Sequence, residues 1–250
     1  MGASRPIEPE PSPRATGSRA DGGSIDRLRA VVSDEASIRE WTAVANDSIV
    51  ATAGILEGFA GAGADQRALV LAAVIATIAG MFATGGSRWA EAAAERDAQL
   101  DAAADEAASL AVAPEEELRE LVAYYQAKGL SSDLAHRVAE ELTARDPLAA
   151  QLESEHGIRR VLSRTDLVMA GIGAALAYGV GAAIPLVITV VVPTAIETSL
   201  IFVAVIIALV FTSVIGARTG HTNFRHTLVR ALTVGIVTMV VSYAVGTIVF

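Results

Sequence analysis

The sequence predicts an all-α membrane protein with five transmembrane helices and an acidic helical insert, which lies in the cytosol between the second and third helices. Of its 250 residues, 52% are hydrophobic and only 19% are charged, and the mean hydropathy is +0.47. A soluble domain of this size would carry more charge. The net charge of −9 is also uneven, because residues 91–155 hold sixteen Asp and Glu against five Lys and Arg. The remainder is close to neutral, as membrane-spanning segments are.

The N-terminal region divides into a tail and an amphipathic segment. Residues 1–24 combine four prolines with Ser, Gly and Arg, and we expect them to be disordered because such a composition cannot bury a core. No apolar run follows an early basic cluster, so no cleavable signal peptide is expected. In residues 25–42, Ile25, Leu28 and Val32 recur at helical spacing between charges. This pattern favours an interfacial helix that lies along the membrane surface.

Five later segments are long and apolar enough to cross a bilayer, whose hydrocarbon core takes about 20 residues of helix. They are residues 43–63, 68–86, 167–192, 199–215 and 228–250. The first carries Asp47 and Glu57, whereas the second is cleaner. Buried helices of a soluble core are the alternative, but five such segments, several of them apolar all round, argue against it. The membrane part therefore comprises residues 43–88, with two spans, and residues 159–250, with three.

The insert, residues 89–158, is predicted to form a compact module of three or four helices. Residues 90–111 are rich in Ala, Glu and Asp, and we expect them to continue the second span about 30 Å beyond the membrane. Pro114 begins the next helix with three glutamates in its first turn, and Gly129 ends it. Pro147 marks the end of the helix after that.

The distribution of arginine orients the chain in the membrane. Arginines cluster before the first span, before the third, and between the fourth and fifth, whereas the other two connections contain only Arg67. The three clusters are Arg27, Arg29 and Arg39; Arg159, Arg160 and Arg164; and Arg218, Arg225 and Arg230. The positive-inside rule then places the N-terminus, the insert and the fourth connection in the cytosol, and the C-terminus on the far side.

Small residues recur four apart in two of the spans. Gly54 and Gly58 form such a pair in the first span, and Gly171, Ala175 and Gly179 form a series in the third. These surfaces let helices or protomers approach backbone to backbone. The pattern fits a dimer seam and ordinary packing within one chain about equally well.

Several classes of chemistry are excluded or disfavoured. The chain has no cysteine, which excludes disulfides, thiolate metal sites and thiol catalysis. No hydrolase elbow, phosphate loop or paired-histidine helix occurs, so we do not expect an enzyme. Basic residues are too sparse for nucleic-acid binding. His221 and His226 lie five apart in a basic loop, a spacing more typical of surface or phosphate contacts than of a metal site.

Four short motifs occur in a fixed order along the chain. They are residues 45–50 (Ala-Asn-Asp-Ser-Ile-Val), residues 95–97 (Glu-Arg-Asp), the stretch from Pro114 through Tyr124 and Gly129 to residues 139–142 with Glu155 beyond it, and residues 216–218 (Gly-Ala-Arg). Each motif is weak alone, but their order and spacing together are specific. From about Asp34 onward, the chain resembles the vacuolar iron transporter (VIT) family of divalent-cation transporters.

The resemblance implies a homodimer of five-span protomers that moves Fe²⁺ or Mn²⁺ out of the cytosol in exchange for protons, without a fixed cofactor. We expect it in the cell membrane. The insert would be the family's metal-binding domain, and the family's ligand positions fall on Glu106, Ser109, Glu117 and Glu120, with Glu155 as a further carboxylate. Sites made only of oxygen suit Fe²⁺, Mn²⁺, Mg²⁺ or Ca²⁺ better than soft ions. A solvated acidic surface is the alternative. Beside Glu155, His156 is an additional candidate ligand.

The ionisable residues within the spans are further candidates, because charges inside a membrane mark pathways or pairs. Asp47 matches the family's transport-path aspartate, and an N-terminal helix cap is the alternative. Glu57 lies about 15 Å deeper along the helix and is either a second relay site or a polar contact across the dimer. Thr84 and Arg88 stand where the family has Met and Glu. We expect Arg88 to pair with Asp47 and to compete with the metal.

These departures leave two functions open. The first is a proton-coupled exporter of Fe²⁺ or Mn²⁺, supported by the resemblance over the whole chain and by Asp47. The second is a membrane protein that binds or senses metal on the same scaffold without transporting it, supported by Thr84, Arg88 and Ser109. The first is favoured.

Overall fold

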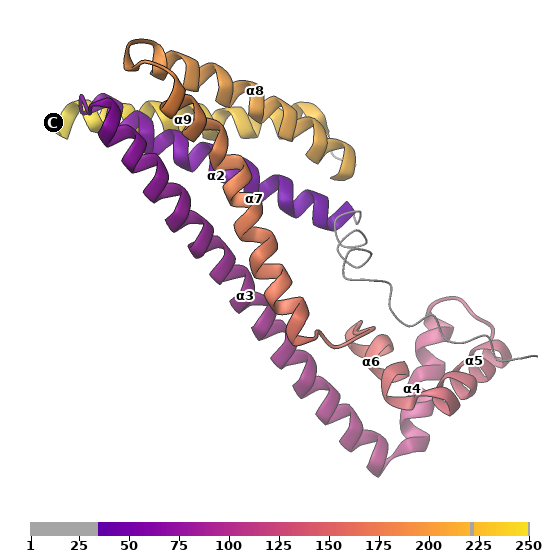
Figure 1. Ribbon diagram of the computed structural model, residues 1–250. Helices are drawn as coiled ribbons and strands as arrows, with labels where there is room; N and C mark the ends of the chain where they lie inside the picture. The colour runs from indigo at the N-terminus through magenta and orange to yellow at the C-terminus, as the bar shows by residue number, and fades with distance from the viewer. Residues whose placement is uncertain (1–34, 221–222, 250) are drawn as a thin grey trace, which may run out of the picture.

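The computed structural model of the protein describes residues 35–220 and 223–249, which form helices and no strand (Figure 1). The helices are α2 (Glu35–Gly61), α3 (Gln66–Val112), α4 (Pro114–Ala127), α5 (Ser132–Arg145), α6 (Pro147–His156), α7 (Arg164–Val191), α8 (Thr194–Gly220) and α9 (Phe224–Val249). The predicted tail, residues 1–24, and most of the predicted interfacial helix, residues 25–42, lie outside the described residues. Residues 35–42 form the first turns of α2, continuous with the first predicted span.

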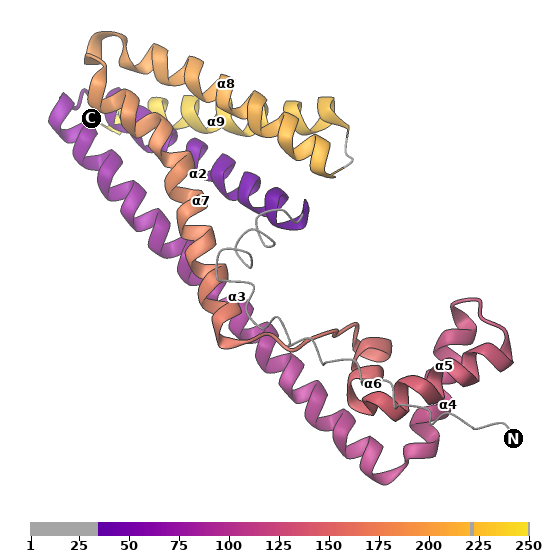
Figure 2. The ribbon, with the colours of Figure 1, turned by 45° about the vertical axis from the view of Figure 1, so that its right-hand side comes forward.

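The long helix α3 connects the two parts of the structure. It runs for 47 residues, about 70 Å, from the helical bundle to the insert (Figure 2). Asp65 caps its start, since its carboxylate accepts a hydrogen bond of 2.9 Å from the backbone N–H of Ala68. The expectation that residues 90–111 continue the second span as one helix is therefore confirmed.

Three short helices complete the insert at the far end of α3. Pro114 occupies the first turn of α4 together with three glutamates, as predicted. Gly129 has a φ of +99° in the turn after α4, a conformation that favours glycine. Asp146 ends α5 and caps α6, because its side chain accepts a hydrogen bond from the backbone N–H of Ala149. With the end of α3, these helices form the predicted compact module.

The chain returns from the insert to the bundle along α3. The backbone of Leu162 is held on both sides by α3 side chains: Arg96 donates from Nε to its carbonyl at 2.9 Å, and Oε1 of Gln99 accepts from its N–H at 2.8 Å. Ser163 then caps α7 in a capping box with Asp166. These contacts fix where α7 begins relative to α3.

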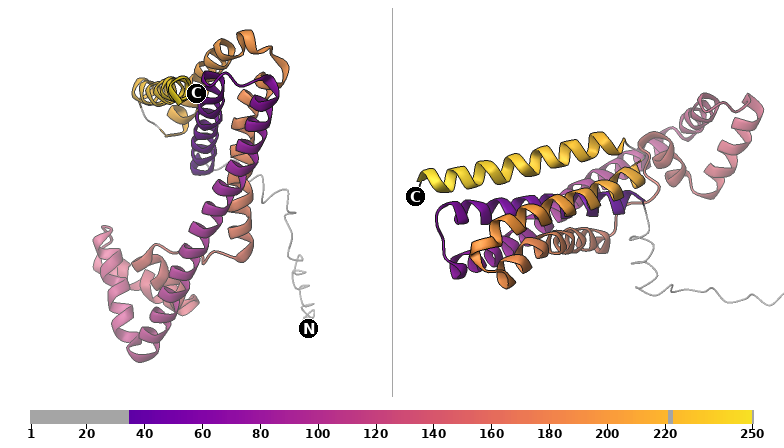
Figure 3. Two further views of the ribbon diagram at one scale, coloured as in Figure 1. Left: turned by 90° about the vertical axis from the view of Figure 1, so that its left-hand side faces the viewer. Right: turned by 90° about the horizontal axis from the view of Figure 1, so that it is seen from above.

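Helix α2 lies at the centre of the bundle and contacts α3, α7, α8 and α9. Figure 3 shows α9 running beside it. Buried apolar side chains from α2, α3, α8 and α9 form the core around it. They include Ile49 and Leu56 of α2, Leu69 of α3, Leu209 of α8 and Met239 of α9. Because neighbours surround it, α2 can carry polar residues that a helix facing lipid could not.

Four of the described helices are long and apolar enough to cross a membrane, judged by length and composition alone. They are α3, α7, residues Thr198–Arg218 of α8, and α9. Their outer surfaces are apolar: Phe82, Val180 and Phe211 are each more than 60% exposed in the single chain. Surfaces of this kind are unfavourable in water, and the chain is therefore a multi-pass membrane protein. Helix α2 is not among the four, so its role as a fifth span stays a prediction.

Both patterns of small residues pack within the chain. A Cβ added at Gly54 would lie 2.9 Å from Cγ2 of Thr238, which places this surface of α2 against α9. A Cβ added at Gly171 would lie 2.9 Å from the carbonyl oxygen of Gly85, which places α7 against α3. Ordinary packing within one protomer thus accounts for these glycines.

The contact between α3 and α7 generates a test on two adjacent glycines. We expect Gly85→Ala to destabilise the protein by about 1–3 kcal/mol, because its Cβ would lie 2.9 Å from the backbone oxygen of Gly171. Gly86→Ala is the matched control, since its Cβ would meet no atom of the described residues within 4 Å. Thermal unfolding in detergent should give a lower Tm for the first variant only. Equal Tm values for the two variants would contradict this packing.

Candidate metal site and transport path

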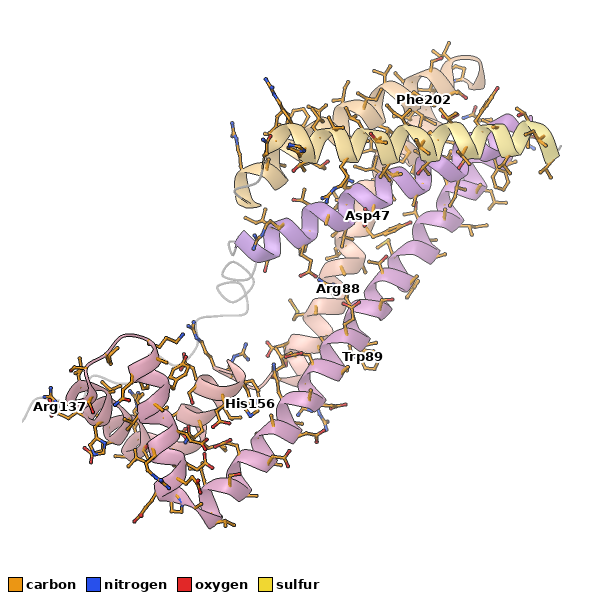
Figure 4. All side chains as sticks on the ribbon, turned by 180° about the vertical axis from the view of Figure 1, so that it is seen from behind. Asp47, Arg88, Trp89, Arg137, His156 and Phe202 are labelled. Carbon is orange, nitrogen blue, oxygen red and sulfur yellow. The ribbon has the colours of Figure 1, made fainter. Side chains whose placement is uncertain are left out.

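Four carboxylates and one imidazole converge in the insert from three helices. Glu106 comes from α3, Glu117 and Glu120 from α4, and Glu155 and His156 from the end of α6. In one group, a carboxylate oxygen from each of Glu117, Glu120 and Glu155 lies within 4.8 Å of the other two. In a second group, ligand atoms of Glu106, Glu155 and His156 lie equally close together. Glu155 belongs to both groups. Figure 4 shows His156 on the side of the insert that faces α3.

Helix geometry brings these residues together. Glu117 and Glu120 lie one turn apart on α4, so their side chains share a face. Helix α6 packs against both α3 and α4, and this packing carries Glu155 to the other carboxylates. The αL conformation of Gly157, with a φ of +67°, ends α6 directly after His156.

Two of the four carboxylates are buried. Glu106 is 5% exposed and Glu117 is 8% exposed, whereas Glu120 and Glu155 are exposed. The buried Gln151 orients Glu117, because its Nε2 donates to Oε2 of Glu117 at 3.2 Å and also to the backbone carbonyl of Glu117. Within the described residues, Oε1 of Glu106 accepts no hydrogen bond. A buried oxygen of this kind can accept a ligand.

The cluster carries negative charge that no arginine or lysine of the described residues balances through an ion pair. Burial, followed by the charges of Glu117 and Glu155, raises the pKa of Glu106 to about 7. Desolvation by the surrounding helices, followed by the neighbouring carboxyl of Glu120, also raises the pKa of Glu155 although part of its side chain is exposed. The carboxyl group of Glu106 is therefore partly protonated near neutral pH, and a divalent cation would displace that proton.

Ser109 brings a hydroxyl rather than a carboxylate to its position on α3. It lies near the end of α3 with an exposed side chain, and its carbonyl accepts the backbone N–H of Ala113. The position that resembles a family ligand thus contributes no carboxylate. Gln151 was not predicted from the sequence, because its hydrogen bonds to Glu117 depend on how α6 packs against α4.

In the bundle, Asp47 lines an open groove between α2, α8 and α9. Helix α2 begins at Glu35, more than three turns before Asp47. The alternative that Asp47 caps the helix is therefore wrong. Beside it, Asn46 accepts a hydrogen bond of 2.9 Å from Oγ1 of Thr212, which ties α2 to α8.

Glu57 is completely buried within the single chain. It follows Ser48 and Thr52 in a buried polar series along α2. A side chain enclosed within its own protomer cannot contact a partner, so the alternative of a polar contact across a dimer is wrong. A role as a relay site stays a prediction.

Arg88 pairs with Glu40 and Glu91, and the expected pairing with Asp47 is wrong. Its guanidinium donates from Nε to Oε1 of Glu40 at 2.7 Å and from Nη1 to Oε2 of Glu91 at 2.7 Å. Figure 4 shows Arg88 on α3, nearer to the insert than Asp47 on α2. Glu40 precedes Asp47 by about two turns of α2 and reaches the guanidinium instead. Thr84 lies half-buried on α3, one turn before Arg88.

Comparison with known proteins agrees with these features. The chain matches the VIT family over residues 38–247. It is also 32% identical over 115 residues to a vacuolar iron transporter of Acanthamoeba castellanii, an alignment that covers 46% of this chain and 41% of that protein. The chain thus spans about two fifths of this curated relative. Because the family match extends over most of the sequence, the chain belongs to the VIT family.

Proposed function

We propose that the protein transports a divalent metal ion, Fe²⁺ or Mn²⁺, out of the cytosol in exchange for protons, and that it is not an enzyme. The cluster of Glu106, Glu117, Glu120 and Glu155 carries the proposal. Four carboxylates from three helices hold excess negative charge and a buried oxygen without a hydrogen-bond donor in the described residues. A hard or borderline divalent cation supplies the missing positive charge. The name of the Acanthamoeba relative supports iron as the cargo.

The identity of the ligand atoms supports Fe²⁺ or Mn²⁺ over Mg²⁺ or Ca²⁺. Carboxylates alone suit all four ions, but His156 adds an imidazole nitrogen beside Glu106 and Glu155. Mg²⁺ and Ca²⁺ prefer oxygen, whereas imidazole binds transition metals. His156 therefore acts as the ligand that favours Fe²⁺ or Mn²⁺.

The path across the membrane follows α2. With 27 residues, about 40 Å, α2 is long enough to serve as the first of five spans. Asp47 is open to the groove, and its carboxylate can bind either a cation or a proton. Glu57 lies deeper on the same helix as a second carboxylate. Alternate occupation of these groups by metal and proton gives an exchanger.

The remaining features follow the arginine distribution and the family. The positive-inside rule places the N-terminus and the insert in the cytosol. The family supports a homodimer, and we expect it in the cell membrane. The partners are then divalent metal ions, protons, the lipid bilayer and a second copy of the chain.

The first test measures metal flux in the wild type and in a variant of Asp47. We expect proteoliposomes with an imposed pH gradient to take up Fe²⁺ and Mn²⁺, and Asp47→Asn to abolish this uptake because the amide cannot exchange a proton for a metal. Asp101→Asn is the control, since Asp101 is exposed in the cytosolic half of α3. Flux that survives Asp47→Asn would refute the proposed path. Metal binding without flux by well-folded wild type would instead favour a sensor or scaffold.

Metal binding to the insert should depend on pH. Glu106, with a pKa of about 7, must lose its proton before it binds metal. Below pH 7, the apparent affinity of the wild type for Mn²⁺ should fall by up to about tenfold per pH unit. Glu106→Gln should bind Mn²⁺ more weakly at pH 8 and show a shallower pH dependence.

Calorimetric titration of the full chain in detergent between pH 6 and pH 8 measures both effects. Asp105→Asn is the matched control, because Asp105 is exposed beside Glu106 and lies outside the cluster. Identical pH dependence in the wild type and Glu106→Gln would remove Glu106 from the site.

His156 should determine ion preference. His156→Ala removes the nitrogen ligand, and we expect Mn²⁺ affinity to fall about tenfold or more while Ca²⁺ affinity changes little. His136→Ala is the control, since His136 is exposed on α5 and pairs with Glu140. Equal loss of Mn²⁺ and Ca²⁺ affinity would show that His156 does not set the preference.

A further inference from the structure

The groove that Asp47 lines is predominantly basic. It has a volume of about 1150 Å³ and lies between the first half of α2, the end of α8 and the start of α9. Its charged lining residues are Arg39 of α2, Arg225 and Arg230 of α9, and a single carboxylate, Asp47. His226 also lines it. A cavity of this size can hold more than one small inorganic ion.

The groove arginines differ from the other arginines near the membrane. Arg88 pairs with Glu40 and Glu91, and Arg160 pairs with Asp166. In contrast, the described residues offer Arg39, Arg225 and Arg230 no ion pair. Guanidinium groups that line one groove from two helices, without an ion pair in the described residues, suit the oxygens of a phosphate, which they can bind through paired hydrogen bonds.

The start of α9 adds to this positive potential. Arg225 and His226 belong to its first turn, where backbone N–H groups point out of the helix and the dipole is positive. Asn223 orders this turn, because its Oδ1 accepts the N–H of Arg225 at 3.0 Å. Both side chains and backbone at this end of the groove therefore favour an anion.

Asp47 does not prevent anion binding at the other end. It lies eight residues after Arg39 on α2, which separates the two by about 12 Å along the helix. The Asp47 carboxylate is thus about two turns of α2 from Arg39, and it is one negative charge against three arginines in the groove lining. The hydrogen bond between Thr212 and Asn46 holds α8 against α2 beside it, so the walls of the groove are already in place.

The groove also has an apolar wall along α9. Val229 and Val234 line it and are 62% and 55% exposed. Val234 lies about 13 Å beyond Arg225 along the helix. Since α9 is one of the helices apolar enough to cross a membrane, this wall would face acyl chains. A basic end followed by an apolar wall matches a phospholipid better than a soluble phosphate.

We propose that this groove binds an anionic phospholipid, with its phosphate on Arg39, Arg225 and Arg230 and its acyl chains along α9. The proposal requires α9 to cross the membrane and does not depend on metal transport. Basic pockets between transmembrane helices on the cytosolic side are suited to anionic headgroups. The orientation expected from the arginines places the groove on that side.

The test measures lipid retention by native mass spectrometry. Protein from micelles that contain phosphatidylglycerol and phosphatidylcholine in equal amounts should retain one phosphatidylglycerol per protomer. Arg225→Gln/Arg230→Gln should reduce this fraction about tenfold or more. Arg137→Gln/Arg145→Gln, which removes two exposed arginines from the insert, should retain lipid like the wild type. Arg225→Lys/Arg230→Lys preserves charge and should give intermediate retention because lysine lacks the paired donors.

Competition with soluble compounds identifies the source of the phosphate. Glycerol phosphate and inorganic phosphate, which lack acyl chains, should displace phosphatidylglycerol only at concentrations at least a hundredfold higher. Displacement at equal concentration would overturn the lipid assignment. Equal retention of phosphatidylglycerol and phosphatidylcholine by wild type would overturn the site itself. If the glutamine variant does not fold, retention in the lysine variant equal to wild type would overturn the role of the guanidinium groups.

Discussion

The continuity of α3 positions the insert, with its cluster of carboxylates, relative to the helical bundle. This helix carries Arg88 at the edge of the bundle and Glu106 in the insert, and α7 packs along it through Gly85 and Gly171. The contacts of Arg96 and Gln99 with Leu162 bring the chain back beside it. Because a helix transmits position along its length far better than a loop, the distance from the insert to the bundle is fixed by the length of α3.

Within the insert, burial and like charge act together. Placing Glu106 and Glu117 out of solvent beside two further carboxylates raises the free energy of the fully ionised cluster, which is why Glu106 has a pKa of about 7. A divalent cation bound there would neutralise the charge and coordinate the buried oxygen of Glu106 that accepts no hydrogen bond from the described residues. The fully ionised cluster is thus less favourable than the partly protonated one, and this property would suit the exchange of protons for metal that we propose.

Local signals in the sequence predicted most helix ends. The features that could not be predicted depend on contacts between helices. Pro114, Gly129 and Pro147 punctuate the insert through their own backbone preferences, and the structure places the breaks there. The partner of Arg88 depends on how α2 crosses α3, which places Glu40 rather than Asp47 within reach. The burial of Glu57 likewise depends on the four helices around α2. Neither could be obtained from spacing along one segment.

The insert carries excess negative charge, whereas the lining of the groove carries excess positive charge. If the protein transports metal as we propose, a cation that leaves the acidic cluster would approach Asp47 through a region that contains Arg39, Arg225 and Arg230. Arg88 adds little to this barrier, because Glu40 and Glu91 neutralise it. A phosphate bound to the groove arginines would neutralise them in the same way, leaving Asp47 as the uncompensated charge. The bound lipid would then lower the electrostatic cost for a cation that enters the groove, so the composition of the membrane would set how readily metal reaches α2.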